Sequence, residues 1–367
     1  MILEHLELTN YRNYRSLSLD LAPGINVVCG DNAQGKTNLL EAVYFLGTLR
    51  SFRVRSEAEL VNWGQMCAGI KADFIRSDGQ GRTLEVRWAK NEQGRWERRT
   101  KRNQVILKSY GDFLSEVPLT LFIPQDLSLI QGGPDMRRRY LDVLLCKTSS
   151  SYFRSLLRYQ QVLKQRNEWL KTRGRNWKEL EIWDEQMVDL AAVIVEHRRR
   201  ALDELNAITG RIFAGLSPQP LKMELSYASS LSGSRSDMLA LLSRRRELEI
   251  QRKCTLEGPQ RDDMLLTVEG KSFKLCASQG QSRSAALALR LAEALYLGQV
   301  CRNSAIVLLD DCFSELDKGR CQRLFDYLGG VGQVIITAVD RLSYAGSAAV
   351  SEFLVDEGQI APLDALA

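Results

Sequence analysis

The sequence has little of what a metal or redox site requires. It contains two histidines and eight cysteines, and no two of the cysteines form a Cys-x-x-Cys pair. These absences argue against a zinc site and against a redox-active cysteine pair. Cys29 and Cys276 lie in apolar runs, which is typical of small buried thiols. We therefore assign no function to the cysteines.

Long hydrophobic segments are absent as well. The longest apolar runs, such as 305–309 and 334–336, fall far short of the ~18 residues that a membrane helix needs. The first residues show no basic stretch followed by an apolar one, so no secretory signal is visible. We expect a cytoplasmic protein that does not contact a membrane.

The composition is that of an ordinary globular protein. Charged residues make up 26% of the chain and the hydrophobic set 44%, which excludes a disordered, collagen-like or disulfide-scaffold protein. At about 150 residues per domain, 367 residues suggest two or three packed units.

Positive charge is concentrated locally, although the formal net charge is only 50 − 45 = +5. Three arginine triplets stand at 137–139, 198–200 and 244–246, and seven basic residues face two acidic ones between positions 90 and 108. A single charge run usually forms a solvated face, but several on one chain suggest a phosphate backbone as partner. Arg102, Arg138 and Arg245 represent these basic runs as candidate DNA contacts.

The order of predicted elements indicates an α/β protein with a helical insertion. Short strands precede position 29, a helix follows from Lys36, and further strands run from about 68 to 123 as an antiparallel addition. After Pro134 the apolar spacing predicts two antiparallel helices, the longer reaching about 50 Å. We expect a parallel sheet built from both ends of the chain, with the following division: an N-terminal head part at 1–125, a helical arm at 126–254 and a C-terminal head part at 255–367.

A phosphate-binding loop is the strongest motif. It follows a predicted strand and opens a predicted helix, which is the context that gives the pattern meaning. Its glycines would let backbone amides point at phosphate oxygens, and Lys36 would neutralise the β- and γ-phosphates while Thr37 joins a Mg²⁺ shell. The motif at 30–37 and the next residue, Asn38, give the candidate ATP-binding residues. They are Gly30, Asp31, Asn32, Ala33, Gln34, Gly35, Lys36, Thr37 and Asn38.

An acidic pair ends a second apolar strand. Asp310 is placed to reach Mg²⁺ directly or through water, and Asp311 to orient the attacking water or accept its proton. Alone, such a pair could equally be an acidic turn. Beside the phosphate-binding loop it predicts ATP hydrolysis.

A serine-glycine element opens another predicted helix. Ser278, Gly280 and Gln281 belong to a Ser-x-Gly-Gln sequence, and a Ser-x-Leu-Asp sequence at 314–317 follows the acidic pair. In this order the motifs resemble those of ABC-type ATPases, in which the serine element of one protomer closes on the nucleotide of the other.

Across the whole chain the motifs resemble the RecF family, bacterial recombination mediators related to SMC proteins. The segments that carry the resemblance are Asn-Tyr-Arg-Asn-Tyr at 10–14, the loop and helix at 30–42, Arg-Ser-Phe-Arg at 50–53, and the segments 122–142, 258–263, 277–281 and 310–317. The resemblance implies an ABC-type P-loop ATPase head with an inserted arm.

The same resemblance implies a function. It implies ATP-driven homodimerisation with Mg²⁺ and ATP, binding to double-stranded DNA near gaps, weak DNA-stimulated ATP hydrolysis that releases the DNA, and cooperation with RecR and RecO in loading RecA. It also places Arg12 and Asn13 near the nucleotide, and it likens Gln125 to the Q-loop glutamine that senses metal and γ-phosphate.

Three positions depart from the usual family pattern. Gln125 stands where glutamate is more frequent, Gln260 where histidine is usual, and Asp31 where glutamate is common. The alternative function is the ATPase subunit of a membrane transporter. It is disfavoured because Lys36 and Ser278 are 278 − 36 = 242 positions apart, more than such a subunit's compact helical insert requires. An SMC-like rod needs much longer coiled coils, and a P-loop kinase leaves the Ser-x-Gly-Gln element unexplained.

Overall fold

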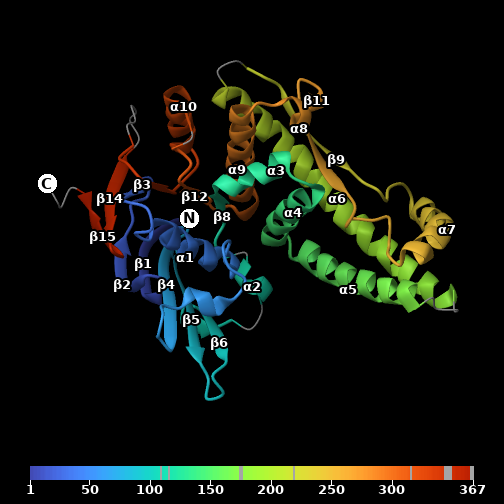
Figure 1. Ribbon diagram of the computed structural model, residues 1–367, viewed down its shortest axis with the longest axis horizontal. Helices are drawn as coiled ribbons and strands as arrows, with labels where there is room; N and C mark the ends of the chain where they lie inside the picture. Colours follow the sequence, from blue (N-terminus) through green and yellow to red (C-terminus); the bar gives the residue numbers. More distant parts are fainter. Residues whose placement is uncertain are drawn as a thin grey trace. The chain divides into compact units, whose positions relative to one another are not determined.

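The computed structural model describes residues 1–107, 110–114, 116–172, 177–217, 220–314, 316–342 and 349–363 (Figure 1). The chain forms two compact units. The first comprises Met1–Asp126, Arg211–Leu221 and Gln279–Ala367, and the second comprises Leu127–Gly210 and Lys222–Ser278. The predicted C-terminal head part begins at 255, whereas the second unit extends to Ser278 because β10 (Asp263–Val268) pairs with β9 (Met223–Ala228).

One sheet of the first unit is antiparallel, with strand order β2-β1-β4-β5-β6-β7. Its strands are β1 (Ile2–Tyr11), β2 (Tyr14–Asp20), β4 (Cys67–Ile75), β5 (Gly81–Lys90), β6 (Trp96–Arg102) and β7 (Val105–Ile106). Leu6 and Leu8 alternate with polar residues along β1 and face Leu19 and Leu17 of β2. This alternation buries one face of the sheet and leaves the other polar. The strands between 67 and 106 are antiparallel, as predicted, but the segment Leu119–Phe122, which the prediction placed in the same antiparallel addition, is a strand of the other sheet and pairs there in parallel.

The other sheet of the first unit draws its strands from both ends of the chain, as predicted. Its order is β15-β14-β3-β13-β12-β8, and β3, β14, β13, β12 and β8 are parallel to one another. β3, β12 and β13 are buried at every residue, which explains their continuous apolar sequences. The strands are β3 (Ile25–Cys29), β8 (Leu119–Phe122), β12 (Ile306–Asp310), β13 (Val334–Ala338), β14 (Val350–Asp356) and β15 (Gln359–Pro362).

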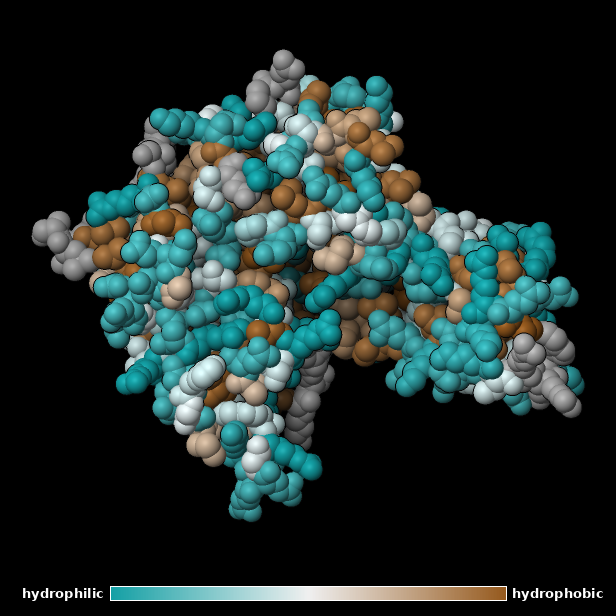
Figure 2. Space-filling model, viewed as in Figure 1, coloured by the Kyte–Doolittle hydropathy of each residue, from teal (hydrophilic) through white to brown (hydrophobic). Residues whose placement is uncertain are grey.

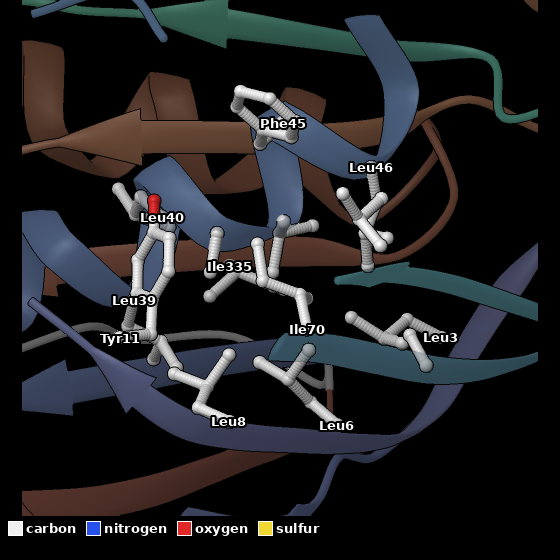
Figure 3. Packing of buried hydrophobic residues seen from close by; sticks show 14 of the residues in the cluster. Leu3, Leu6, Leu8, Tyr11, Leu39, Leu40, Phe45, Leu46, Ile70 and Ile335 are labelled. Carbon is white, nitrogen blue, oxygen red and sulfur yellow. The ribbon is translucent and has the colours of Figure 1, made fainter. Parts of the chain in front are cut away.

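Helix α1 (Lys36–Thr48) packs between the two sheets. Figure 3 shows Leu39, Leu40, Phe45 and Leu46 of α1 among leucines of β1 and beside Ile70 of β4. The remaining helices of this unit are η1 (Glu57–Leu60), α2 (Tyr110–Leu114), η2 (Pro124–Asp126), α9 (Gln279–Cys301) and α10 (Lys318–Leu328). The hydrophobic core that α1 shares with both sheets therefore fixes where the first turn of α1 lies relative to the ends of the parallel strands.

The second unit is mainly helical. Its helices are α3 (Leu127–Gln131), α4 (Pro134–Thr148), α5 (Ser150–Thr172), α6 (Trp177–Leu216, whose last turn lies in the first unit), α7 (Arg235–Arg252) and α8 (Phe273–Cys276). A small sheet joins β9, β10 and β11 (Lys271–Ser272). The 40 residues of α6 span about 60 Å, longer than the predicted 50 Å.

Helices α5 and α6 run antiparallel, as predicted. Tyr152 of α5 meets His197 of α6, whereas Arg166, later in α5, bonds to Asp184, earlier in α6. Arg166 interrupts the apolar stripe of α5 and is fully buried, with Asp184 and Glu249 accepting hydrogen bonds of 2.8 and 2.7 Å from its guanidinium. The polar residue that interrupts the apolar stripe of α5 thus belongs to a buried network of ion pairs.

No helix among the described residues has an apolar stretch long enough to cross a lipid bilayer.

Candidate nucleotide site

The loop between β3 and α1 needs glycine at both ends. Gly30 has a φ of 152° and Gly35 a φ of 120°, conformations that side chains rarely adopt. A Cβ atom on Gly30 would lie 2.4 Å from the carbonyl oxygen of Val355, and one on Gly35 would lie 2.6 Å from the Asn13 amide nitrogen. The backbone of β14 at Gly30, the Asn13 side chain at Gly35 and the positive φ of both residues thus disfavour any side chain at these two positions.

The turn between β1 and β2 supports the loop. The Asn13 amide donates a 2.9 Å hydrogen bond to the carbonyl of Gln34, and the Tyr14 hydroxyl donates one of 3.0 Å to the carbonyl of Gly35. The Asn38 amide in turn donates a 2.8 Å bond to the Asn13 side chain. The predicted site residues Asn13, Gln34, Gly35 and Asn38 are therefore brought together in one hydrogen-bonded group.

Lys36 is the first residue of α1 and is buried. Its ammonium donates hydrogen bonds to the carbonyl of Gly30 and, at 2.7 Å, to that of Asp31. The loop therefore encloses a positive charge at a helix N-terminus, where the backbone dipoles also attract anions. Such an arrangement suits the terminal phosphates of a nucleotide.

Thr37 and Asp310 form the oxygen-rich side of the site. The Thr37 hydroxyl donates a 3.0 Å hydrogen bond to the Asp310 carboxylate, and the Thr337 hydroxyl donates one of 2.7 Å to the same oxygen. Burial raises the pKa of Asp310, and the two hydroxyl donors partly oppose that shift. A hydroxyl and a carboxylate are hard oxygen ligands of the kind that Mg²⁺ prefers.

The residues fit a Mg²⁺ ion that is shared with phosphates. Among the described parts of the chain, no three His, Cys, Asp or Glu side chains form a cluster that could hold a metal. An ion held by Thr37 and Asp310 would take its other ligands from phosphate oxygens and water, as Mg²⁺ commonly does.

Asp311 directly follows β12 in the left-handed region, with a φ of 46°. Its N–H donates to the carbonyl of Thr337 at 3.2 Å and to the hydroxyl of Thr337 at 3.1 Å. The strand end is thus anchored to β13, which separates β12 from β3 in the sheet. The half-buried Asp311 therefore stands at the same edge of the sheet as the phosphate-type loop.

Gln125 lies in η2, just beyond the carboxyl end of β8. Because β8 pairs in parallel with β12, Gln125 follows a strand end at the edge where Asp310 stands, and it is exposed. The next residue, Asp126, is buried and bonded to Arg290 of α9 at 3.1 and 2.7 Å. Sequence reasoning missed this pair because its members are 164 positions apart.

The Ser-x-Gly-Gln residues open α9, with Ser278 preceding the helix and Gly280 and Gln281 in its first turn. A Cβ atom on Gly280 would lie 3.0 Å from a guanidinium nitrogen of Arg320. Arg320 is bonded at 2.8 Å to Asp317, which caps α10. The first turn of α9 therefore lies beside the Ser-x-Leu-Asp sequence.

Arg12 contacts α1 beyond its first turn, at Glu41. Its guanidinium donates hydrogen bonds of 2.7 and 2.8 Å to the buried carboxylate of Glu41 and one of 2.8 Å to the carbonyl of Glu59. Arg53, which the sequence analysis quoted only as part of a family motif, donates a 2.6 Å bond to the Asn38 side chain. Arg53 is therefore bonded directly to a predicted site residue.

The three candidate DNA arginines all have partners within the protein. Two of them pair with a carboxylate and one bonds both to a carboxylate and to a backbone carbonyl. The contacts are Arg102 with Glu116 at 2.5 Å, Arg245 with Glu257 at 3.0 Å, and Arg138 with Asp135 and, at 2.7 Å, with the carbonyl of Asp262.

Comparison with known proteins agrees with the resemblance seen in the sequence. The family model described as the RecF/RecN/SMC N-terminal domain matches residues 2–360. The DNA replication and repair protein RecF of Heliobacterium modesticaldum is 39% identical over 347 residues, covering 92% of each chain. RecF of Bacillus subtilis is 34% identical over 376 residues, covering 98% of this chain and 100% of its own.

Solved structures give the same result. A structure of the recombination mediator RecF with ATP, from the RecFOR pathway, matches with a TM-score of 0.87 and 30% identity, covering 98% of this chain and 97% of that one. An Smc head bound to the C-terminal winged-helix domain of ScpA has a TM-score of 0.60 at 15% identity and covers all of both chains, so it shows the fold alone. The fold is that of the RecF and SMC ATPase heads, and the transporter alternative is not favoured.

Proposed function

The chain belongs to the RecF/RecN/SMC family, where it groups with RecF, and from this membership we propose that it is an ATP-dependent DNA-binding protein of recombinational repair. The observation that carries the proposal is the hydrogen bond between Thr37 and Asp310 beside the Lys36 loop. This hydrogen bond supports a single site for a metal ion and phosphate that is built from residues of both ends of the chain. Similar RecF structures contain ATP, which supports ATP as the nucleotide here.

Each site residue has a proposed role. The loop amides of 30–35 and the Lys36 ammonium bind the β- and γ-phosphates. Thr37 and Asp310 hold Mg²⁺, which when bound neutralises phosphate charge. Asp311 orients the attacking water and accepts its proton, and Gln125 senses the γ-phosphate.

We propose that ATP closes a homodimer. Ser278, Gly280 and Gln281 of one protomer contact the γ-phosphate of the ATP bound in the other. ADP lacks that phosphate, so only ATP gains these contacts and favours the dimer. Slow hydrolysis, stimulated by DNA, then opens the dimer.

The closed dimer would bind double-stranded DNA at gaps or at junctions with single strands. The RecFOR pathway named for the solved relatives supports RecR and RecO as partners, and loading of RecA is the expected outcome. These activities would take place in the cytoplasm.

The test is fluorescence anisotropy of a short gapped duplex at fixed salt, with ATP or ADP, together with light scattering to measure dimer formation. We expect ATP to raise both DNA affinity and dimer content. Lys36→Arg is expected to weaken the response, and Ser278→Arg to abolish it while leaving ATP binding to the monomer intact.

The matched control is Ser243→Arg, which adds the same charge at an exposed position of α7. We expect this variant to behave like wild type. Equal DNA binding with ATP and ADP, or wild-type behaviour of Ser278→Arg, would contradict the ATP-closed dimer.

A further inference from the structure

The arginine triplets are largely engaged in holding the second unit together. Two members of each triplet pair with carboxylates of the same unit. The least exposed arginine of each triplet pairs as follows: Arg137 with Asp263 at 2.8 Å, Arg198 with Asp142 at 2.7 Å, and Arg246 with Asp184 at 3.2 Å. Density of positive charge along the sequence therefore does not identify a surface that is available to an anion.

The solvent face of α5 has a different character. At 100° per residue, ten exposed residues of this helix fall within one arc of about 160°. They are Ser151, Arg154, Leu157, Arg158, Gln161, Lys164, Gln165, Glu168, Lys171 and Thr172. The face therefore carries four cations, one acid and several neutral hydrogen-bonding side chains.

Three of these cations have no ion-pair partner among the described residues, although the charge of Lys164 also acts on Glu168. Arg154, Arg158 and Lys164 form no ion pair or hydrogen bond with any residue that the structure describes. The acid of the face, Glu168, accepts a 2.8 Å hydrogen bond from Lys171, which lowers the pKa of Glu168. The positive charge of this face is thus left for an external anion.

The neighbouring helix α6 is the opposite case. Its exposed residues include Glu181, Glu185 and Asp189, and arginines of α7 pair with all three. Arg235 bonds to Asp189 at 2.7 Å, and Arg246 lies 3.4 Å from Glu181. An anion approaching this unit would therefore meet more unpaired positive charge on α5 than on this stretch of α6, where acids and arginines are paired.

The composition of the α5 face distinguishes among nucleic acids. Arginine, lysine, glutamine, serine and threonine are the side chains that contact phosphate oxygens. The ten exposed residues include no aromatic side chain on which an unpaired base could stack, because Tyr152, Tyr159 and Trp169 of α5 are buried and Phe153 is half-buried. This composition favours the backbone of a duplex over a single strand.

We infer that the solvent face of α5 (Arg154, Arg158 and Lys164) binds the phosphate backbone of double-stranded DNA, an inference that rests on the proposed DNA-binding function. The ten residue steps from Arg154 to Lys164 rise about 15 Å, the length of roughly four phosphates along one strand. α5 is labelled in Figure 1, and hydrophilic residues cover most of the corresponding surface in Figure 2.

The test is the salt dependence of duplex binding in the presence of ATP. The variant Arg154→Ala/Arg158→Ala/Lys164→Ala removes three cations from a solvent-exposed face. Each lost phosphate contact makes the slope of log K against log salt shallower by about 0.9, so three contacts predict a change of about 2.7. ATP affinity, measured on the same preparations, is expected to stay at the wild-type value and shows that the chain is folded.

The control removes the same charge from the triplets. Arg139, Arg199 and Arg244 are exposed, and the variant Arg139→Ala/Arg199→Ala/Arg244→Ala is expected to keep the wild-type slope. An unchanged slope in the α5 variant, or equal changes in the two variants, would overturn the inference while the proposed function stands. If the wild type with ATP binds no duplex, the proposed function fails and this inference fails with it.

Discussion

The hydroxyl of Thr37 donates a 3.0 Å hydrogen bond to the carboxylate of Asp310, although the two residues stand 273 positions apart. Thr37 belongs to the first turn of α1 and Asp310 ends β12, and the parallel order β3-β13-β12 places both at one edge of the sheet. The candidate site exists only when both ends of the chain are folded into the same unit.

Asp311 is expected to act in hydrolysis and not in ATP binding. Asp311→Asn should lower the turnover number by roughly 10²–10⁴-fold, the usual contribution of a general base, with ATP affinity unchanged. Steady-state hydrolysis and equilibrium nucleotide binding measure the two quantities. Asp326→Asn, on exposed surface of α10, removes the same charge and should have no effect. Equal turnover in the two variants would exclude Asp311 as the base.

The buried carboxyl of Asp310 predicts a pH effect on stability. Its pKa in the folded protein lies above the ordinary value of 3.8, so the folded state holds this proton more tightly than the unfolded state. As pH rises between those two pKa values, the free energy of unfolding therefore falls. Asp310→Asn has no carboxyl to titrate and so does not lose this stability. The free energy of unfolding of the variant minus that of the wild type should therefore be more positive at pH 7 than at pH 3.5. Urea unfolding at both pH values tests this, and a less favourable effect at pH 7 would contradict it.

Asn13 is expected to hold the loop for ATP. Asn13→Ala removes the 2.9 Å bond to the carbonyl of Gln34, which should cost about 1 kcal/mol, or roughly five-fold in ATP affinity. Titration with a fluorescent ATP analogue measures the change. Asn91→Ala removes a comparable side-chain bond, to Glu97 in the β5–β6 hairpin, and serves as the control. Similar affinities for the two variants would show that Asn13 does not support the nucleotide site.

The ion network around Arg166 is expected to be costly to break. Arg166→Met leaves Glu249 buried without its arginine and leaves Asp184 with Arg246 as its remaining partner, and it should lower the free energy of unfolding by about 3–5 kcal/mol. Replacing all three residues by leucine should recover much of that loss, because no buried charge then remains unpaired.

Urea denaturation of the two variants provides the measurement. Arg158→Met, on the exposed face of the same helix, should change the free energy of unfolding by less than about 0.5 kcal/mol. A loss in Arg166→Met no larger than in Arg158→Met would show that the network contributes little.

Features that depend on neighbours in the sequence were predictable. The loop at 30–35 stands between a strand and a helix, and the structure has β3 and α1 there. The alternation of leucines in β1 and the three-four spacing in α6 likewise reflect how side chains repeat along a strand and a helix.

Features that depend on distant partners were not predictable. Asp126 meets Arg290, and Arg166 meets both Asp184 and Glu249, yet no local pattern marks these pairs. The domain limit near 278 depends in the same way on the pairing of β9 with β10.

The sequence by itself determined the phosphate-type loop, the acidic strand end and the alternation of strands and helices, because backbone periodicity and local spacing encode them. Only the tertiary structure decided which positive charges are available to an external anion. It paired Arg137, Arg198 and Arg246 with carboxylates of the same unit, while the cations of α5 stayed exposed. The reason is physical: a buried charge is stable only beside an opposite charge, and folding alone determines which charges become buried and which remain in water.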